Sequence, residues 1–280
     1  AMHACADMDA DGAPEVIVAL GAHAWCWSIV ENSSYSGTQP FRGGAWAGLE
    51  VLDGATGAPR WQRKLLFGAE HDIPRLDRFA AGPDLDGDGC RELFAAWTAW
   101  DSALRKNVLA VRALSGRDGR ALWRAREPVP APGIDSDVDR ESALCFWQAD
   151  ADGMPFLVVP VNFGSAAPPA TYIFSSSTGA PAHTVAGAND PRAVDLDGDG
   201  ILDLCYTLAD QGTRRLCAIR GGCAEPWKRL GSWKPLQDLD GDGCVDFVGN
   251  DGDSDAFVVR SGRDGRRLWR ASRTQNEDCI

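Results

Sequence analysis

Short apolar segments recur along the whole chain and are separated by turns rich in Gly, Asp and Pro. In one representative unit, residues 77–82 lead into an acidic turn and residues 92–100 leave it, while residues 107–114 and 120–126 flank a glycine-rich turn. Short segments with two-residue periodicity between turn residues are typical of β-hairpins. No long segment has a convincing helical pattern, so the sequence predicts an all-β protein built of four-stranded units.

Two kinds of turn alternate along the chain. The first is an acidic box of nine residues, with carboxylates at positions one, three, five and nine. Its complete copies, here called the first to fourth boxes, are residues 7–15, 84–92, 195–203 and 238–246, and a degenerate copy is 148–156. The second kind is a glycine turn, followed by Trp in its best copies, at residues 52–61, 114–123, 174–183, 219–227 and 259–269. Internal repetition of this kind predicts a repeat architecture.

The repeated unit favours one arrangement of sheets. A four-stranded unit cannot bury both of its faces alone, and sheets packed face to face in a radial array form a β-propeller. We therefore predict a propeller of four-stranded antiparallel blades, which is either five-bladed or an arc of a larger ring. The blades are expected at residues 3–68, 76–127, 143–187, 191–231 and 234–273, in a single domain spanning 1–274 with a tail at 275–280.

The boxes have the composition of a site for a hard cation. Ca²⁺ takes six to eight oxygen ligands in flexible geometry. An EF-hand begins similarly but needs Glu at position twelve, where this chain has Val18, Ala95, Tyr206 and Gly249. Solvated acidic turns without metal are the alternative, because Asp and Gly are common turn formers. The fixed spacing of the fourth carboxylate favours metal, except in the degenerate box, where Phe156 replaces that carboxylate.

The boxes resemble FG-GAP repeats, the calcium-binding blades of integrin α-subunit propellers and of many secreted bacterial proteins. The glycine turns resemble the tryptophan-docking turns of quinoprotein (PQQ-like) propellers, and together the likenesses cover nearly all of residues 3–273. FG-GAP repeats hold the metal by side chains at positions one, three, five and nine and by the carbonyl at position seven. The resemblance thus implies about four Ca²⁺ sites, made by Asp7, Asp9, Asp11, Ala13 and Glu15; by Asp84, Asp86, Asp88, Cys90 and Glu92; by Asp195, Asp197, Asp199, Ile201 and Asp203; and by Asp238, Asp240, Asp242, Cys244 and Asp246.

The charge balance narrows the class of partner. With 40 acidic and 28 basic residues the net charge is −12, which argues against nucleic acid or an anionic membrane surface. The 24 arginines are dispersed and are expected to serve solubility. No apolar run is long enough to span a membrane, and the first residues do not resemble a signal peptide.

Nine cysteines are scattered without CxxC pairs. With calcium boxes they indicate an oxidising, calcium-rich compartment, so we expect an extracellular, cell-surface or periplasmic protein with disulfides. Cys205 and Cys217 lie on consecutive expected strands and are predicted to face each other. Cys5 and Cys279 are placed where a disulfide would close the ring, which is a hypothesis.

The tryptophans are expected mainly in the core. Those after the glycine turns suit packing between blades, one per blade. They are Trp61, Trp123, Trp227 and Trp269. For Trp25, Trp27, Trp97 and Trp100, which follow boxes, burial is favoured over a rim position that would stack on sugar rings.

Little in the sequence indicates catalysis. The four histidines stand alone and no motif of nucleophilic catalysis occurs. The leading function is therefore a secreted or cell-surface Ca²⁺-binding propeller acting as a non-enzymatic protein- or glycan-binding adhesion module. Other copies or chains of a surface assembly are candidate partners. The alternative is a carbohydrate-active enzyme such as a polysaccharide lyase, because calcium-bearing propellers occur among these enzymes.

Overall fold

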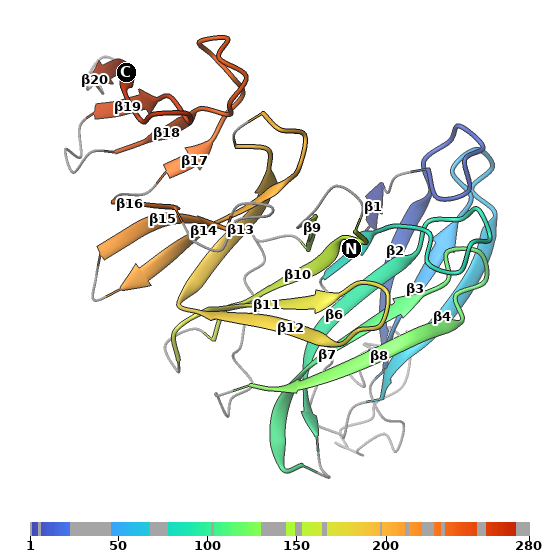
Figure 1. Ribbon diagram of the computed structural model, residues 1–280. Coiled ribbons are helices and arrows are strands. Elements are labelled where there is room, and N and C mark those ends of the chain that lie inside the picture. Colours follow the sequence, from blue (N-terminus) through green and yellow to red (C-terminus); the bar gives the residue numbers. More distant parts are fainter. Residues whose placement is uncertain are drawn as a thin grey trace, which may run out of the picture. The chain divides into compact units, whose positions relative to one another are not determined.

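The protein is all-β, as the sequence predicts. The computed structural model describes residues 2–4, 7–22, 46–67, 78–101, 104–129, 144–148, 153–163, 167–196, 198–210, 213–219, 227–230, 233–250 and 256–272. Throughout these ranges the regular structure is strand, with no helix (Figure 1). No helix that would be long and apolar enough to cross a membrane was found among these residues.

Within this part of the chain, twenty strands form five separate four-stranded sheets. The first sheet contains β1 (Met2–Ala4), β2 (Val16–Ala22), β3 (Trp46–Leu52) and β4 (Pro59–Phe67). The second contains β5 (Arg78–Ala81), β6 (Leu93–Asp101), β7 (Lys106–Leu114) and β8 (Ala121–Pro128). The third contains β9 (Cys145–Trp147), β10 (Phe156–Val161), β11 (Ala170–Ser175) and β12 (Pro181–Ala186). The fourth contains β13 (Ala188–Val194), β14 (Asp203–Asp210), β15 (Thr213–Ile219) and β16 (Trp227–Leu230). The fifth contains β17 (Trp233–Pro235), β18 (Phe247–Gly249), β19 (Ala256–Arg260) and β20 (Arg267–Ser272).

Each sheet is an antiparallel meander in which strands adjacent in sequence are adjacent in the sheet. This is the strand order of a propeller blade, and it confirms the predicted fold class. Every complete box lies between the first and second strands of its sheet, and the glycine turn lies between the third and fourth strands. Both turns of a blade therefore fall at the same end of the meander.

The glycine turns share one backbone geometry. In the four turns that the structure describes, the last glycine has φ between 70° and 73°, a region that favours glycine. These residues are Gly57, Gly119, Gly179 and Gly265. Beside the turn, the pairing of the third and fourth strands shifts in register. The shift lies between Val51 and Leu52 in the first sheet and at the equivalent place in the second, third and fifth sheets. The sequence therefore repeats a turn and a β-bulge together.

The chain divides into two compact units. The first comprises residues 1–138 and 177–179, and the second comprises residues 139–176 and 180–280. The first unit thus holds the first two sheets, and the second unit holds the other three. The expectation of a single domain over residues 1–274 stays a prediction.

In the first unit, the two sheets pack face to face around a common core. Its members come from β2, β3 and β4 on one side and from β6 and β7 on the other. They are Met8, Ile17, Leu49, Val51, Trp61, Leu65, Leu93, Ala95, Trp97, Ala110 and Leu114. Met8 belongs to the first box, so this acidic turn is anchored in the core by its second residue. Trp97 is 3% exposed and is therefore buried rather than at a rim.

Trp61 joins the two sheets of this unit directly. Its indole Nε1 donates a hydrogen bond to the carbonyl oxygen of Gly116, 2.8 Å away in the glycine turn of the second sheet. Gly119, in the same turn, lies so close that a Cβ there would be 2.6 Å from Trp61 Cε3. Trp123 packs in the same way on Gly179, where a Cβ would lie 2.4 Å from the ring. A glycine turn is thus the socket for the tryptophan of the preceding blade.

The prediction that Trp269 is a core residue is wrong, because 48% of it is exposed. Trp269 lies on β20, the last strand of the fifth sheet, where it occupies the place that Trp61 has on β4. Trp61, which has its socket, is only 8% exposed. The side chain of Trp227 lies outside the described residues, as do Trp25 and Trp27.

In the second unit, the fourth sheet is covered on both faces. Towards the third sheet it contributes to a core of Val158, Ile173, Ala188, Leu204, Tyr206 and Cys217. Towards the fifth sheet it contributes to a core of Leu196, Cys205, Trp233, Phe247 and Val258. Sheets buried on both faces explain why their central strands are nearly continuous runs of apolar residues.

The predicted pairing of Cys205 with Cys217 is wrong. Cys205 is opposite Ala218 in the register of β14 and β15, and Cys217 is opposite Tyr206. Because successive side chains leave a strand on opposite faces, the two sulfurs point into the two different cores. No disulfide joins any two of the cysteines that the structure describes, Cys90, Cys145, Cys205, Cys217 and Cys244. Cys5 and Cys279 lie outside the described residues.

Alanine at Gly119 is expected to lower the free energy of unfolding more than alanine at Gly57. The two glycines have φ of 70° and 71°, so each substitution carries the same backbone cost of about 1–2 kcal/mol. A Cβ at Gly119 would contact Trp61, whereas a Cβ at Gly57 meets nothing within 4 Å. Overpacking should add about 1–3 kcal/mol at Gly119 alone. Urea unfolding of both variants measures the difference, and equal losses would contradict the docking contact.

Candidate metal centres

The acidic boxes turn tightly because two of their residues adopt the left-handed region. In the second, third and fourth boxes both are glycines, at positions four and six, with φ between 74° and 87°. The first box has Ala10 at position four, with φ of 61°, and Gly12 at position six, with φ of 93°. Residues with a Cβ rarely adopt this conformation. The sequence Asp-Gly-Asp-Gly is therefore a backbone requirement, and the first box departs from it at Ala10.

The carboxylate at position one holds the loop closed from inside. Asp84 Oδ1 accepts a hydrogen bond from Gly87 N at 2.7 Å, and its Oδ2 accepts one from Gly89 N at 2.9 Å. Asp195 and Asp238 accept the same two bonds, and Asp7 accepts from Asp11 N and Gly12 N. The N–H groups of Gly243 and Gly241 lower the pKa of Asp238, and the carboxylate form is thereby favoured.

The carboxylate at position nine is buried in every complete box. Glu15, Glu92 and Asp246 are 0% exposed, and Asp203 is 2% exposed. Each of the four accepts a hydrogen bond from the backbone N–H at position two, over 2.5 to 3.0 Å. Burial raises the pKa of the Glu92 carboxyl, although the N–H groups of Leu85 and Gly116 oppose this rise. A buried carboxylate of this kind needs compensation by donors or by a cation.

The position-nine carboxylate also connects the box to the glycine turn of the same blade. In the second box, Glu92 Oε2 accepts a hydrogen bond from Gly116 N at 3.0 Å. In the fourth box, Asp246 Oδ1 accepts one from Gly262 N at 3.2 Å. One buried side chain therefore fixes two turns that lie at the same end of the sheet.

The carboxylates converge as a shared ion would require. In the first box, one oxygen each from Asp7, Asp9, Asp11 and Glu15 lie within 4.8 Å of one another. The second and fourth boxes bring together positions one, three and nine in the same way: Asp84, Asp86 and Glu92, and Asp238, Asp240 and Asp246. Ca²⁺ binds oxygen at about 2.3–2.6 Å, so two ligands of one ion lie up to about 5 Å apart. The donor sets therefore fit a hard cation.

The position-five carboxylate belongs to the oxygen cluster in the first box, where it is Asp11, but not in the second and fourth boxes. Asp88 and Asp242 stand outside the clusters of the second and fourth boxes and accept hydrogen bonds from Cys90 N at 2.8 Å and Cys244 N at 2.9 Å. Asp199 accepts the equivalent bond from Ile201 N in the third box. The carbonyl ligands at position seven, in Ala13, Cys90, Ile201 and Cys244, stay predictions.

Asp197, at position three of the third box, lies outside the described residues, as does much of the degenerate box, so neither cluster is defined.

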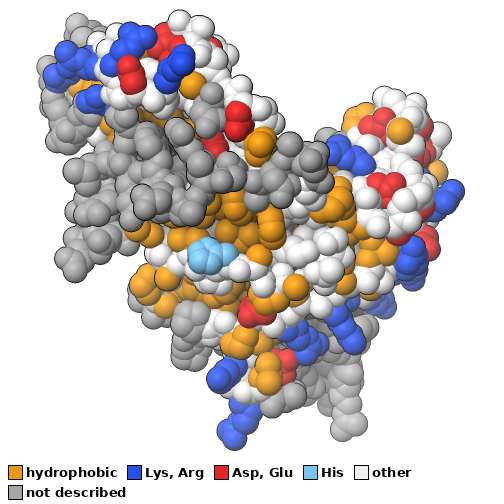
Figure 2. Space-filling view, in the orientation of Figure 1, with side chains coloured by type: hydrophobic (Ala, Val, Ile, Leu, Met, Phe, Trp, Pro, Cys, Tyr) orange, Lys and Arg blue, Asp and Glu red, His pale blue; other side chains and the backbone are white. Residues whose placement is uncertain are grey.

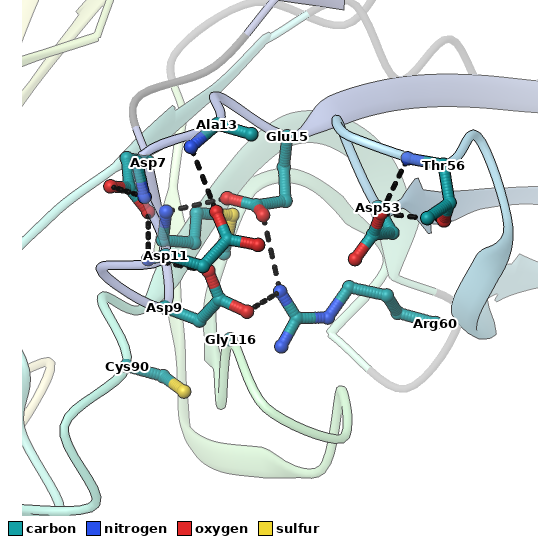
Figure 3. Close-up of polar contacts among 12 residues, drawn as sticks. Asp7, Asp9, Asp11, Ala13, Glu15, Asp53, Thr56, Arg60, Cys90 and Gly116 are labelled. Carbon is teal, nitrogen blue, oxygen red and sulfur yellow. Dashed lines mark hydrogen bonds and ion pairs between the residues drawn. The ribbon is translucent and has the colours of Figure 1, made fainter.

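The sequence did not lead us to expect that arginines beside the boxes pair with the acidic residues. Arg120 Nη2 lies 2.6 Å from Asp86 Oδ2, and Arg266 Nη2 lies 2.8 Å from Asp240 Oδ2. In the first box, Arg60 Nη1 lies 2.6 Å from Asp9 Oδ2 and 3.1 Å from Glu15 Oε1 (Figure 3). The signal in the sequence was an arginine one or three residues after the last glycine of the first, second and fifth glycine turns. Because arginines are dispersed along the whole chain, these three were expected to serve solubility.

Neighbouring boxes contact each other within each unit. In the first unit, Arg91 N donates a hydrogen bond to Met8 O at 2.7 Å, which links the second box to the first. In the second unit, a Cβ at Gly198 would lie 2.5 Å from Gly243 O, so the third and fourth boxes are also adjacent. Figure 2 shows acidic and basic side chains close together at several places on the face that it presents.

Comparison with known proteins leaves the family open. No family model and no curated protein matches the chain. Among solved structures, the crystal structure of BamB from Moraxella catarrhalis aligns with 15% identity and a TM-score of 0.44. The alignment covers 82% of this chain and 58% of that one, so the chain spans less than two thirds of the length of BamB. The five four-stranded meanders themselves establish the fold class.

Replacing Glu92 by Gln is expected to destabilise the calcium-free protein by about 1–3 kcal/mol. Both oxygens of Glu92 accept backbone hydrogen bonds, one from Leu85 N–H and the other from Gly116 N–H. A Gln side chain has only one acceptor oxygen, so its NH₂ group would face one of these two donors and that hydrogen bond would be lost. Asp88→Asn is the matched control, because its remaining oxygen still accepts the bond from Cys90 N. That control should stay within about 0.5 kcal/mol of the wild type. Urea unfolding in EDTA measures both, and a neutral Glu92→Gln variant would contradict the bridging role.

Proposed function

We propose that this chain is a Ca²⁺-stabilised propeller-type module that binds a protein partner outside the cytoplasm. The observation that carries the proposal is the convergence of three or four carboxylate oxygens within 4.8 Å in the first, second and fourth boxes. One member of each cluster is fully buried. So many negative charges in one turn repel one another, and a divalent cation relieves that repulsion.

Calcium suits the donor set better than zinc or magnesium. The clustered ligands are all carboxylate oxygens, whereas Zn²⁺ favours thiolate and imidazole. The thiol of Cys90 lies at position seven, but burial first and Asp88 second raise its pKa, so it stays protonated. Mg²⁺ demands near-ideal octahedral geometry and retains water, while Ca²⁺ accepts the irregular geometry that a turn offers.

The hydrogen bonds within the boxes support a structural rather than a catalytic role for the metal. Positions one, five and nine each accept backbone N–H groups, so their carboxylates already shape the loop. A bound Ca²⁺ would supply positive charge to these oxygens and hold the box beside the glycine turn. Carboxylates committed in this way are poor candidates for the acid and base of a carbohydrate-active enzyme, and we therefore favour binding over catalysis.

Exposed apolar side chains support a binding role. Phe257 on β19 and Trp269 on β20 lie on adjacent strands of the fifth sheet and are 53% and 48% exposed. Large aromatic side chains are enriched in protein interfaces, where they bury much area at small entropic cost. They would also stack on sugar rings, so loss of glycan binding on their removal would redirect the proposal from a protein to a glycan partner.

Removal of calcium is expected to lower the melting temperature by at least about 5 °C. A ligand that binds only the folded state stabilises it by RT ln(1 + [L]/Kd), which is about 2.7 kcal/mol per site at one hundred times Kd. Calorimetric melts in excess CaCl₂ and in EDTA measure the shift. NaCl at matched ionic strength is the control for simple screening. An EDTA-insensitive melt would overturn the calcium assignment.

Asp86→Ala and Asp240→Ala are each expected to remove one bound Ca²⁺. Both residues are members of the oxygen clusters. Asp152→Ala should remove none, because the degenerate box has Phe156 in place of the fourth carboxylate. Equilibrium dialysis with metal analysis counts the ions. Unchanged counts in the first two variants would refute the assignment of ligands to these boxes.

A further inference from the structure

We propose that Arg60 occupies the cation position of the first box, so that this box binds Ca²⁺ weakly unless the arginine is removed. The proposal rests on the Ca²⁺-binding function proposed above for the other boxes. It concerns a single side chain, and it makes the four boxes unequal in spite of their equal spacing.

One guanidinium nitrogen bridges two of the four clustered carboxylates. Arg60 Nη1 lies 2.6 Å from Asp9 Oδ2 and 3.1 Å from Glu15 Oε1. Asp9 and Glu15 are the ligands at positions three and nine, and their cluster with Asp7 and Asp11 spans no more than 4.8 Å. Figure 3 shows the Arg60 guanidinium directed at the carboxylates of Asp9 and Glu15. A cage of this size holds one cation.

The second and fourth boxes hold their arginines differently. Among the described residues, Arg120 and Arg266 reach only the position-three carboxylate of their boxes, Asp86 and Asp240. Their side chains are 55% and 59% exposed, whereas that of Arg60 is 20% exposed. In these two boxes the guanidinium therefore pairs with one carboxylate of the box, whereas that of Arg60 pairs with two carboxylates, one of which is fully buried.

The buried carboxylate shows the same contrast. In the second and fourth boxes, its second oxygen accepts a hydrogen bond from a glycine-turn N–H, that of Gly116 or Gly262. In the first box, the corresponding oxygen of Glu15 accepts its bond from Arg60. A neutral N–H leaves the carboxylate its full negative charge for a metal, whereas a guanidinium neutralises that charge.

The cause lies in the position of the arginine along the repeat. Arg120 and Arg266 immediately follow Gly119 and Gly265 and start from the exposed turn. Arg60 is three residues beyond Gly57 and starts from strand β4, which directs its side chain back over the box. The first box also has Ala10 where the other complete boxes have glycine. Its backbone and its charge both depart from the pattern of the other boxes.

Calcium titration of Arg60→Gln and of the matched variant Arg120→Gln tests the proposal. Isothermal titration calorimetry gives the number of sites and their affinities, and native mass spectrometry counts the bound ions. We expect Arg60→Gln to gain one Ca²⁺ equivalent, with affinity at that site at least about tenfold higher than in the wild type, because a cation no longer competes. We expect Arg120→Gln to leave the number of equivalents unchanged.

Asp9→Asn assigns any change to the first box. In the wild-type background it should leave the Ca²⁺ count unchanged, and combined with Arg60→Gln it should abolish the gained equivalent. Loss of one equivalent in Asp9→Asn alone would overturn the proposal, and this holds even if Arg60→Gln fails to fold. Binding at the other boxes with no gain in Arg60→Gln would overturn it as well. Absence of Ca²⁺ from every variant would instead refute the proposed function, and this inference with it.

Discussion

The buried carboxylate at position nine is the contact on which the end of a blade with a complete box depends. Glu92 receives N–H groups from Leu85 and Asp86 in its own box and from Gly116 in the glycine turn, and it is fully buried. A charge placed there is costly unless it is compensated, so the box and the turn must both approach it. The acidic box, which joins the first two strands of the blade, is thereby held against the glycine turn, which joins the last two.

The glycine turn, once fixed, becomes the point at which the next side chain docks. Gly116 donates its N–H to Glu92 and accepts the indole N–H of Trp61 from the preceding sheet. The acidic box and the tryptophan contact are therefore coupled, because one residue, Gly116, completes the first and accepts the second. Trp269 has the equivalent place on β20 and is 48% exposed, whereas Trp61, docked on its turn, is 8% exposed.

Much of this could be predicted from the sequence, because the signals were local. Apolar runs, turn residues and their period gave the strands and the four-stranded sheets, and the spacing of carboxylates gave the clusters around Glu15, Glu92 and Asp246. The errors arose where the outcome depended on register or on a neighbour. A shift of one residue sends Cys205 and Cys217 to opposite faces, and spacing alone does not contain that information.

Arg60 marks the limit of reasoning from repeats. Its partner Asp9 is 51 residues away in the sequence, and their meeting depends on where β4 begins relative to the glycine turn. Two residues of displacement along that segment, relative to Arg120, convert an exposed ion pair into a guanidinium that bridges two carboxylates. The spacing of carboxylates therefore sets only an upper bound on the number of boxes open to the proposed Ca²⁺. Under the proposed Ca²⁺ binding, the cation in the first box is decided by Arg60 on β4, the last strand of the same sheet, so boxes of equal carboxylate spacing can differ.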